Sequence, residues 1–252
     1  MRSYITTAAL EVLIVFTVVL TGAASTFAQT PPTERPAFSL TASAGLSLTS
    51  GNTDTSMINV AYEVVVNPEG RNLIKSDGLL LRGKNEDQLT ANRVSVTLRD
   101  QFQFNHRAYG FVQNQYLADT FKEIDYFNAP TTGAGYTVID SPTTRLSLEA
   151  GIGVVGEKRT REEMNPWLCL MGGESLTRTL TPTTTITQWF SGILKTKDVR
   201  DSLYTLATDI SATISARSQL KIEVVDTFRN RTASAAVEKN DVALIVAFVY
   251  KM

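Results

Sequence analysis

The chain has 252 residues, and its 24 basic and 25 acidic side chains leave a net charge of −1 at pH 7. This balance offers no basic excess for a nucleic-acid partner and no acidic excess of the kind found in disordered chains. A single cysteine, Cys169, excludes an internal disulfide, a zinc ribbon and a redox pair, and a single histidine, His106, excludes most histidine-based metal sites. We therefore expect no cofactor and no metal, and the length fits one all-β barrel.

The amino end has the pattern of a secretory signal peptide. Arg2 supplies a positive charge, residues 8–20 are mostly apolar, and Thr26 and Ala28 are small residues at the two recognition positions before a cleavage site near Ala28. The alternative is a transmembrane anchor, but the apolar run is shorter than the roughly 20 residues of a spanning helix and contains Glu11. The expected organisation is a signal peptide at 1–28, a short periplasmic lead-in at 29–37 and a barrel at 38–250.

Apolar and polar residues alternate with a period of two along most of the remaining chain, which is typical of β-strands with two different faces. The first run is the clearest, with Leu40 and Leu46 on one face and Thr41 and Ser47 on the other. About twelve strands are predicted, at 38–49, 56–67, 72–83, 92–104, a run ending near 117, 126–138, 145–156, 165–176, 183–194, 203–215, 219–228 and 241–250.

The predicted connections sort by parity. Those after even strands are tight, at 67–70, 105–107, 140–143, 178–182 and 216–218, whereas those after odd strands, except the first at Gly51, are mostly longer and charged. Outer-membrane barrels have short periplasmic turns and longer outer loops. The pattern therefore favours an antiparallel up-and-down transmembrane β-barrel of Gram-negative type.

The last predicted strand, 241–250, looks like the closing strand and assembly signal of such barrels. Its even positions form one apolar face that ends on Phe248 and Tyr250, where a membrane–water boundary favours aromatic residues. Its other face is also apolar, so a buried strand of a soluble sheet has the same pattern. The tail Lys251-Met252 is a departure, because many of these proteins end at the aromatic residue.

In a membrane barrel the apolar face points outward and the polar face lines the lumen. Polar residues expected in the lumen, as a plugging ion-pair network or a thin water path, are Glu63, Arg93, Arg99, Arg145, Glu149 and Glu223. Candidates for an aromatic girdle are Trp167, Trp189, Phe248 and Tyr250, with core packing as the alternative for the two tryptophans.

Other constellations have simpler explanations than catalysis or metal binding. His106 lies in a predicted turn without a nucleophile beside it. The charged stretch 157–163 suits lipopolysaccharide phosphates or divalent ions, and the acids of 119–125 suit calcium, but both are more simply solvated loops. The glycine pairs of 133–135 and 151–153 are expected to make room for a large neighbour rather than to bind a nucleotide.

The segments 51–54, 111–119, 133–136 and 149–153 resemble those of the YdiY-like proteins, a domain-of-unknown-function family often described as salt-stress-induced outer-membrane proteins. The resemblance covers about 38–250 and implies an outer-membrane barrel with no established activity. The partners it implies are outer-membrane lipids, lipopolysaccharide and, during biogenesis, the barrel assembly machinery.

The sequence leaves three functions open. The first is an envelope-maintenance barrel or a narrow pore for ions or small solutes, since a lumen of about twelve strands should be largely filled by side chains. The second is a lipid-modifying enzyme of the outer membrane, although the chain shows no nucleophile–histidine pair. The third is a soluble, secreted lipocalin-like binder, in which the apolar face would point inward.

Overall fold

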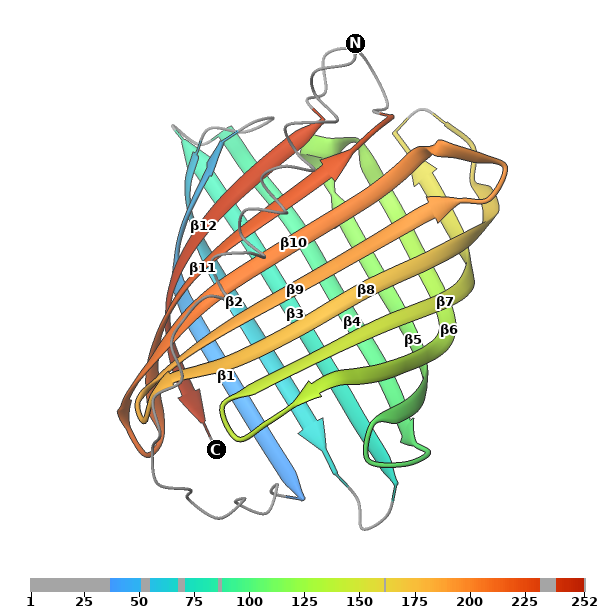
Figure 1. Ribbon diagram of the computed structural model, residues 1–252. Coiled ribbons are helices and arrows are strands. Elements are labelled where there is room, and N and C mark those ends of the chain that lie inside the picture. The colour runs from blue at the N-terminus through green and yellow to red at the C-terminus, as the bar shows by residue number, and fades with distance from the viewer. Residues whose placement is uncertain are drawn as a thin grey trace, which may run out of the picture. The chain divides into compact units, whose positions relative to one another are not determined.

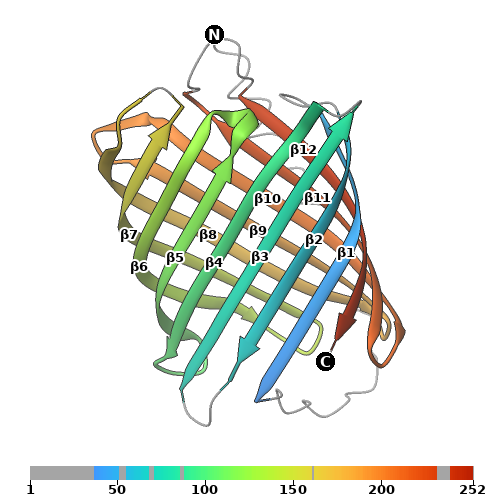
Figure 2. The same ribbon diagram turned by 180° about the vertical axis from the view of Figure 1, so that it is seen from behind.

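Twelve β-strands close into one antiparallel barrel in the computed structural model (Figures 1 and 2). The structure describes residues 37–251 except 51–54, 68–70, 86–87, 161 and 232–238, so the predicted signal peptide and most of the lead-in lie outside the described residues. The elements are β1 (Phe38–Ser50), β2 (Thr55–Val66), β3 (Asn72–Asn85), β4 (Gln88–Gln103), β5 (Ala108–Asp119), the short 3₁₀ helix η1 (Thr120–Lys122), β6 (Ile124–Asp140), β7 (Thr144–Arg159), β8 (Asn165–Thr181), β9 (Thr184–Lys195), β10 (Asp198–Ser215), β11 (Ser218–Arg229) and β12 (Asn240–Lys251). Among these described residues, no helix has the length and apolar character needed to cross a membrane.

The closing strand behaves as predicted. β12 pairs with β11 on one side and with β1 on the other, so the sheet has no open edge. Its even positions from Val242 to Tyr250 point outward and are 37–52% exposed, whereas Ile245, Ala247 and Val249 face inward and are buried. Closure gives each strand a hydrogen-bonding partner on both edges, which a β-structure in lipid requires.

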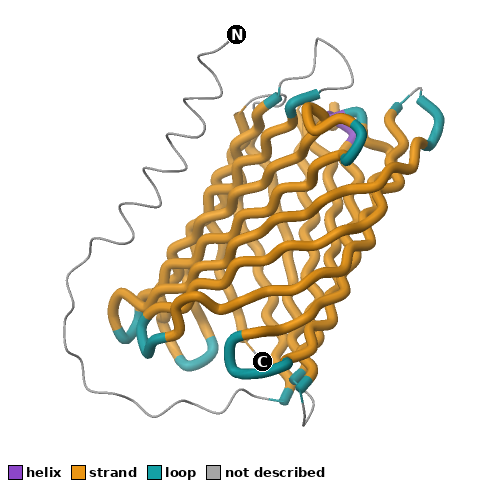
Figure 3. The backbone as a smooth tube through the Cα atoms, turned by 45° about the vertical axis from the view of Figure 1, so that its right-hand side comes forward, coloured by secondary structure: helices purple, strands orange, loops and turns teal. Residues whose placement is uncertain are grey.

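The connections correct the parity argument. We call the end with the β2–β3, β4–β5, β6–β7, β8–β9 and β10–β11 connections the turn end, and the other end the loop end; Figure 3 shows loops at both. At the loop end, 86–87 and 196–197 are only two residues long, and only 230–239 is a long connection. Length therefore does not separate the two ends as predicted. The reason is that strand pairing continues into residues whose charge suggested loops, such as Arg159 and Asp201.

The outer wall between the ends is apolar. Outward residues with large exposed side chains include Leu46 (68%), Ile58 (65%), Val112 (62%) and Ile152 (62%). A soluble barrel would turn this face inward, so the arrangement contradicts the lipocalin-like alternative and fits a wall in contact with lipid.

Aromatic side chains on the outer wall gather toward the two ends. The turn end has Phe38, Phe102, Phe104, Tyr136, Phe248 and Tyr250, all exposed. Toward the loop end, the Tyr116 ring meets that of Tyr126 edge-on at 5.8 Å, and Tyr204 stacks on Phe228 at 6.4 Å. Two aromatic belts around an apolar band are what the two membrane–water boundaries favour.

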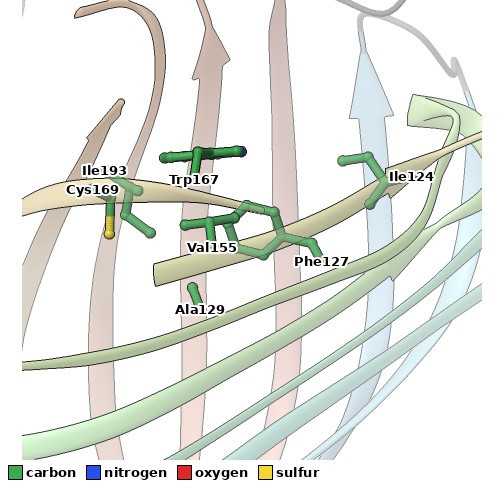
Figure 4. Close-up of a cluster of buried hydrophobic side chains, with 7 residues drawn as sticks. All are labelled: Ile124, Phe127, Ala129, Val155, Trp167, Cys169 and Ile193. Carbon is green, nitrogen blue, oxygen red and sulfur yellow. The ribbon is translucent and has the colours of Figure 1, made fainter. Parts of the chain in front are cut away.

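A hydrophobic cluster fills part of the loop-end half of the lumen. Figure 4 shows its buried members, which come from β6, β7, β8 and β9: Ile124, Phe127, Ala129, Val155, Trp167, Cys169 and Ile193. Leu117 and Leu203 pack against it. These side chains define the inward face of their strands, and the burial of Trp167 there makes a girdle position impossible.

The inward glycines of β6 make room for two large rings, as predicted. A Cβ atom at Gly135 would overlap the ring of Tyr109, and one at Gly133 would lie 2.8 Å from the ring of Phe111. Tyr109 pairs in register with Gly135 and Phe111 with Gly133, so each ring lies across the neighbouring strand. Together with Met171, the two rings form a second buried cluster.

Candidate functional site: the lumen

Eight charged side chains face the lumen at the fourth to seventh residue from the turn end of their strands. All lie at odd positions, the parity of the buried residues Val155, Trp167 and Ile193. We call this set the middle belt: Glu63, Lys75, Asp77, Arg99, Glu149, Asp209, Lys221 and Glu223. It contains five acids and three bases, so its described members have an acidic excess.

One side of the middle belt is open to water. Lys221 lies 2.8 Å from Glu223 and also interacts electrostatically with Asp209 and, on β2, with Glu63. The intervening strands β1 and β12 present small inward residues such as Ser43, Gly45 and Ala247. The Glu63 and Lys75 side chains on β2 and β3 are exposed. Because the outer wall is apolar, these inward charges face a wet part of the lumen.

The other side of the middle belt is packed around one ion pair. The guanidinium of Arg99 on β4 donates to both carboxylate oxygens of Glu149 on β7, at 2.6 and 2.9 Å. Tyr109 donates its hydroxyl to the same carboxylate at 2.8 Å. The Arg99 guanidinium also donates to Gln113 and lies 4.2 Å from the centre of the Phe111 ring. The pair therefore bridges strands separated by β5 and β6, through the lumen.

A second charged layer lies at the loop end, and we call it the mouth network: Glu157, Arg159, Lys195, Asp201 and Arg229. Glu157 on β7 accepts from Arg229 on β11 at 2.8 Å and from Arg159 at 2.9 Å. Asp201 lies within 3.8 Å of Lys195, Arg159 and Arg229. The pair between β7 and β11 crosses the mouth, and the Lys195 ammonium lies over Trp167 of the hydrophobic cluster.

A third bridge reaches across the mouth from the β5–β6 connection. Lys122 of η1 lies 2.7 Å from Asp241 on β12, which is six strands away from β6 in either direction around the barrel. The connection therefore folds inward over the lumen. Burial, and to a lesser extent the neighbouring charge of Arg93, lowers the pKa of Lys122, while Asp241 partly offsets this.

The predicted lumen residues mostly lie inside. Glu63, Arg99, Glu149 and Glu223 belong to the middle belt, and Arg93 faces inward beside its register partner Asp119 near the loop end. Arg145 lies instead at the rim of the turn end, 3.9 Å from Asp140, with 38% of its side chain exposed.

The aromatic predictions divide in the same way. Phe248 and Tyr250 point outward at the turn end, 52% and 39% exposed. Trp167 is buried in the lumen cluster, and Trp189 faces inward between Ser175 and Ala207. Register places both odd positions on the inner wall, and core packing, the alternative for the two tryptophans, is what the structure shows for Trp167.

Sequence reasoning missed most members of the mouth network and the Lys122–Asp241 bridge. Glu157 and Arg159 seemed part of a solvated loop, but both pair inside the mouth. The available signal is parity, because both residues lie at odd positions that continue the inward face of Val155 along β7. Among the described residues, no group of three or more His, Cys, Asp or Glu side chains could hold a metal ion, and His106 is exposed in the β4–β5 connection.

The barrel is similar to solved outer-membrane proteins. The NanC porin matches with a TM-score of 0.59 and 10% identity, over 84% of this chain and 100% of that one. An outer-membrane channel from Pseudomonas putida F1 matches at 0.53 and 8% identity, over 90% and 100%. The KdgM porin matches at 0.50 and 10%, over 84% and 98%. At these identities the likeness shows the fold alone.

The comparison with curated proteins found no match. A family model described as a protein of unknown function, DUF481, matches residues 42–252, which is nearly the whole barrel. The chain belongs to the DUF481 family.

Proposed function

We propose that the protein spans the bacterial outer membrane and forms a narrow channel for ions and small solutes. The observation that carries the channel is the wet side of the middle belt, where Glu63, Lys75 and Glu223 face inward beside small residues of β1 and β12. Charges on the inner wall of a lipid-embedded barrel are tolerated where water reaches them. The apolar outer wall and the two aromatic belts support the membrane location.

The channel is narrow because charged bridges and apolar side chains cross it. Arg99–Glu149 spans the lumen in the middle, and Glu157–Arg229 and Lys122–Asp241 span the mouth. In the middle of the barrel, the Arg99–Glu149 bridge leaves the β1–β3 and β10–β12 side as the route for water. Acids exceed bases in the middle belt, so the channel favours cations, which follows from the same electrostatics as acidic rings in other cation pores.

Planar-bilayer recording of the purified protein tests the proposal. The expected result is small, discrete conductance steps with a reversal potential that shifts toward cation selectivity in a KCl gradient. Glu63→Gln combined with Glu223→Gln should reduce that selectivity. Asp100→Asn is the matched control, because Asp100 lies on the outward face of β4, opposite the outward Val112 in register, and should change nothing.

A structural, envelope-maintaining barrel is the second candidate, and the filling of the loop-end half by the hydrophobic cluster favours it. Complete absence of conductance steps from a correctly folded, membrane-inserted sample would overturn the channel and leave this role. We propose no enzymatic activity; hydrolysis of phospholipid or lipopolysaccharide acyl chains by purified protein would contradict that.

The location implies further proposals about biogenesis and expression. Export would use the signal peptide at 1–28, and insertion would need the barrel assembly machinery, with lipids and lipopolysaccharide around the finished wall. The resemblance to YdiY-like proteins adds induction by salt stress, which quantifying the protein before and after a rise in NaCl tests directly.

A further inference from the structure

A polar strip interrupts the apolar outer wall on β8, β9 and β10. Glu174, Gln188 and Thr208 occupy even positions near the middle of these strands, the parity of the outward residues Leu170 and Ile210. Gln188 pairs in register with Thr208, and its amide donates to the Glu174 carboxylate at 3.5 Å. Glu174 and Thr208 are partly exposed, and Gln188 between them is buried. We call these three residues the outer strip.

Most other strands carry apolar side chains at comparable positions. Midway along their strands, outward residues with exposed side chains are Val60 (52%), Leu80 (43%), Val112 (62%), Ile152 (62%), Ile222 (47%) and Val246 (41%). A neutral polar pair also lies on the outward face of β5 and β6, where the Asn114 amide donates to Asn128 at 2.9 Å; the outer strip differs from that pair in containing an ionisable side chain. Its strands lie opposite β2 and β3 in the closed order.

Lipid cannot satisfy this strip. Hydrocarbon offers no hydrogen-bond donors, and an ionisable side chain on a lipid-facing surface marks a functional contact. The carbonyl oxygen of Gln188 accepts no hydrogen bond from any described residue. A carboxyl group accepts hydrogen bonds, and a threonine hydroxyl both donates and accepts them. Because the Gln188 carbonyl oxygen is buried, the partly exposed Thr208 hydroxyl and Glu174 carboxyl supply the donor and the acceptor for an apposed polar surface.

We infer that the outer strip is an interface with a second copy of this chain. Two copies inserted in the same direction hold their strips at the same depth, so a two-fold axis along the membrane normal brings strip against strip. The axis then lies beside β9, the middle strand of the strip, so β8 of each copy faces β10 of the other, and the Thr208 hydroxyl of one copy can donate to the Glu174 carboxyl of the other. Gly172, beside Glu174 on the outward face, has nothing within 4 Å of its Cβ position and leaves a notch that permits close approach. Small residues beside polar ones are typical of contacts within membranes.

Cross-linking in membranes tests the interface. Thr208→Cys is made in a Cys169→Ala background, so that it is the only thiol, and is treated with a short bismaleimide linker. Val60→Cys on the opposite wall is the matched control. The expected product has twice the chain mass, is abundant for Thr208→Cys and is at least tenfold weaker for Val60→Cys. Equal yields from both positions would overturn the proposal, as would a product whose mass shows a different protein.

Removal of the strip provides the second arm. Glu174→Leu with Gln188→Leu, added to the Thr208→Cys protein, should reduce the product at least tenfold while leaving heat-modifiable gel migration intact. Should that variant fail to fold, Gly172→Leu is added to the Thr208→Cys protein instead. This single substitution fills the notch and should by itself reduce the cross-linked product. An undiminished product from either folded variant contradicts the inference. Cross-linking does not measure channel conductance, so the interface proposal and the channel proposal can each fail without the other.

Discussion

The Arg99–Glu149 pair makes a quantitative prediction about lumen stability. Arg99→Met removes the cation and leaves Glu149 with only Tyr109 as a donor, while 11% of the carboxylate side chain and 14% of the original arginine side chain are exposed. Breaking a well-buried pair costs about 3–5 kcal/mol. Because part of the lumen is wet, we expect the lower end, about 3 kcal/mol of unfolding free energy.

Neutralising the acid of the pair instead of the base should cost less unfolding free energy. Glu149→Gln leaves Arg99 with Gln113 and the Phe111 ring, and keeps an acceptor in place, so we expect a loss of about 1–2 kcal/mol. Arg99→Met with Glu149→Gln removes both charges and should cost less than the sum of the two single variants by about 2 kcal/mol.

The assay is equilibrium unfolding by guanidinium in lipid vesicles, followed by tryptophan fluorescence. Both tryptophans, Trp167 and Trp189, face the lumen side and report on the packing of the barrel interior. Strictly additive single and double variants, or an Arg99→Met loss below about 0.5 kcal/mol, would refute the claim that the pair is a buried bridge across the lumen.

Three further predictions concern packing, the mouth and assembly. Gly135→Val should destabilise the barrel by about 1–3 kcal/mol because its side chain overlaps the Tyr109 ring, and Tyr109→Ala should restore part of the loss in the same unfolding assay. Lys122→Ala should raise single-channel conductance by removing the bridge to Asp241 across the mouth. Because the pKa of Lys122 is lowered, the wild-type bridge should lose its charge, and the conductance should rise, at a pH below that at which an ordinary lysine titrates. A conductance that does not change with pH would contradict the bridge. Tyr250→Ala should slow membrane assembly measured by heat-modifiable folding, whereas deletion of 251–252 should not; the opposite order would move the signal to the tail.

The strand count, closure and most faces could be predicted from the sequence because a barrel repeats the same two-residue period in every strand. Strand ends could not, since the charges of Arg159 and Asp201 point into the mouth and do not stop backbone pairing. β3 alternates poorly because its inward face mixes charged Lys75 with apolar Leu81, and only the register of its neighbours assigns it.

Partners across the lumen were beyond the sequence for a different reason. Arg99 and Glu149 were both expected inside, but which inward residues meet depends on the stagger between strands accumulated around the closed sheet. The contact between Trp167 and Val155 is set more locally, by the register between the neighbouring strands β7 and β8. The outer strip was hidden because 184–190 mixes polar and apolar residues on both faces, so its alternation does not reveal which side Gln188 occupies.

Membrane insertion is the claim on which the lumen, the channel and the interface all depend. Outer-membrane fractionation followed by gel electrophoresis with and without heating tests it in one measurement. The barrel should be found in the outer-membrane fraction and should migrate faster unheated than heated, because a closed sheet resists detergent until it is boiled. Recovery in the soluble periplasmic fraction, with no change of migration on heating, would contradict the account.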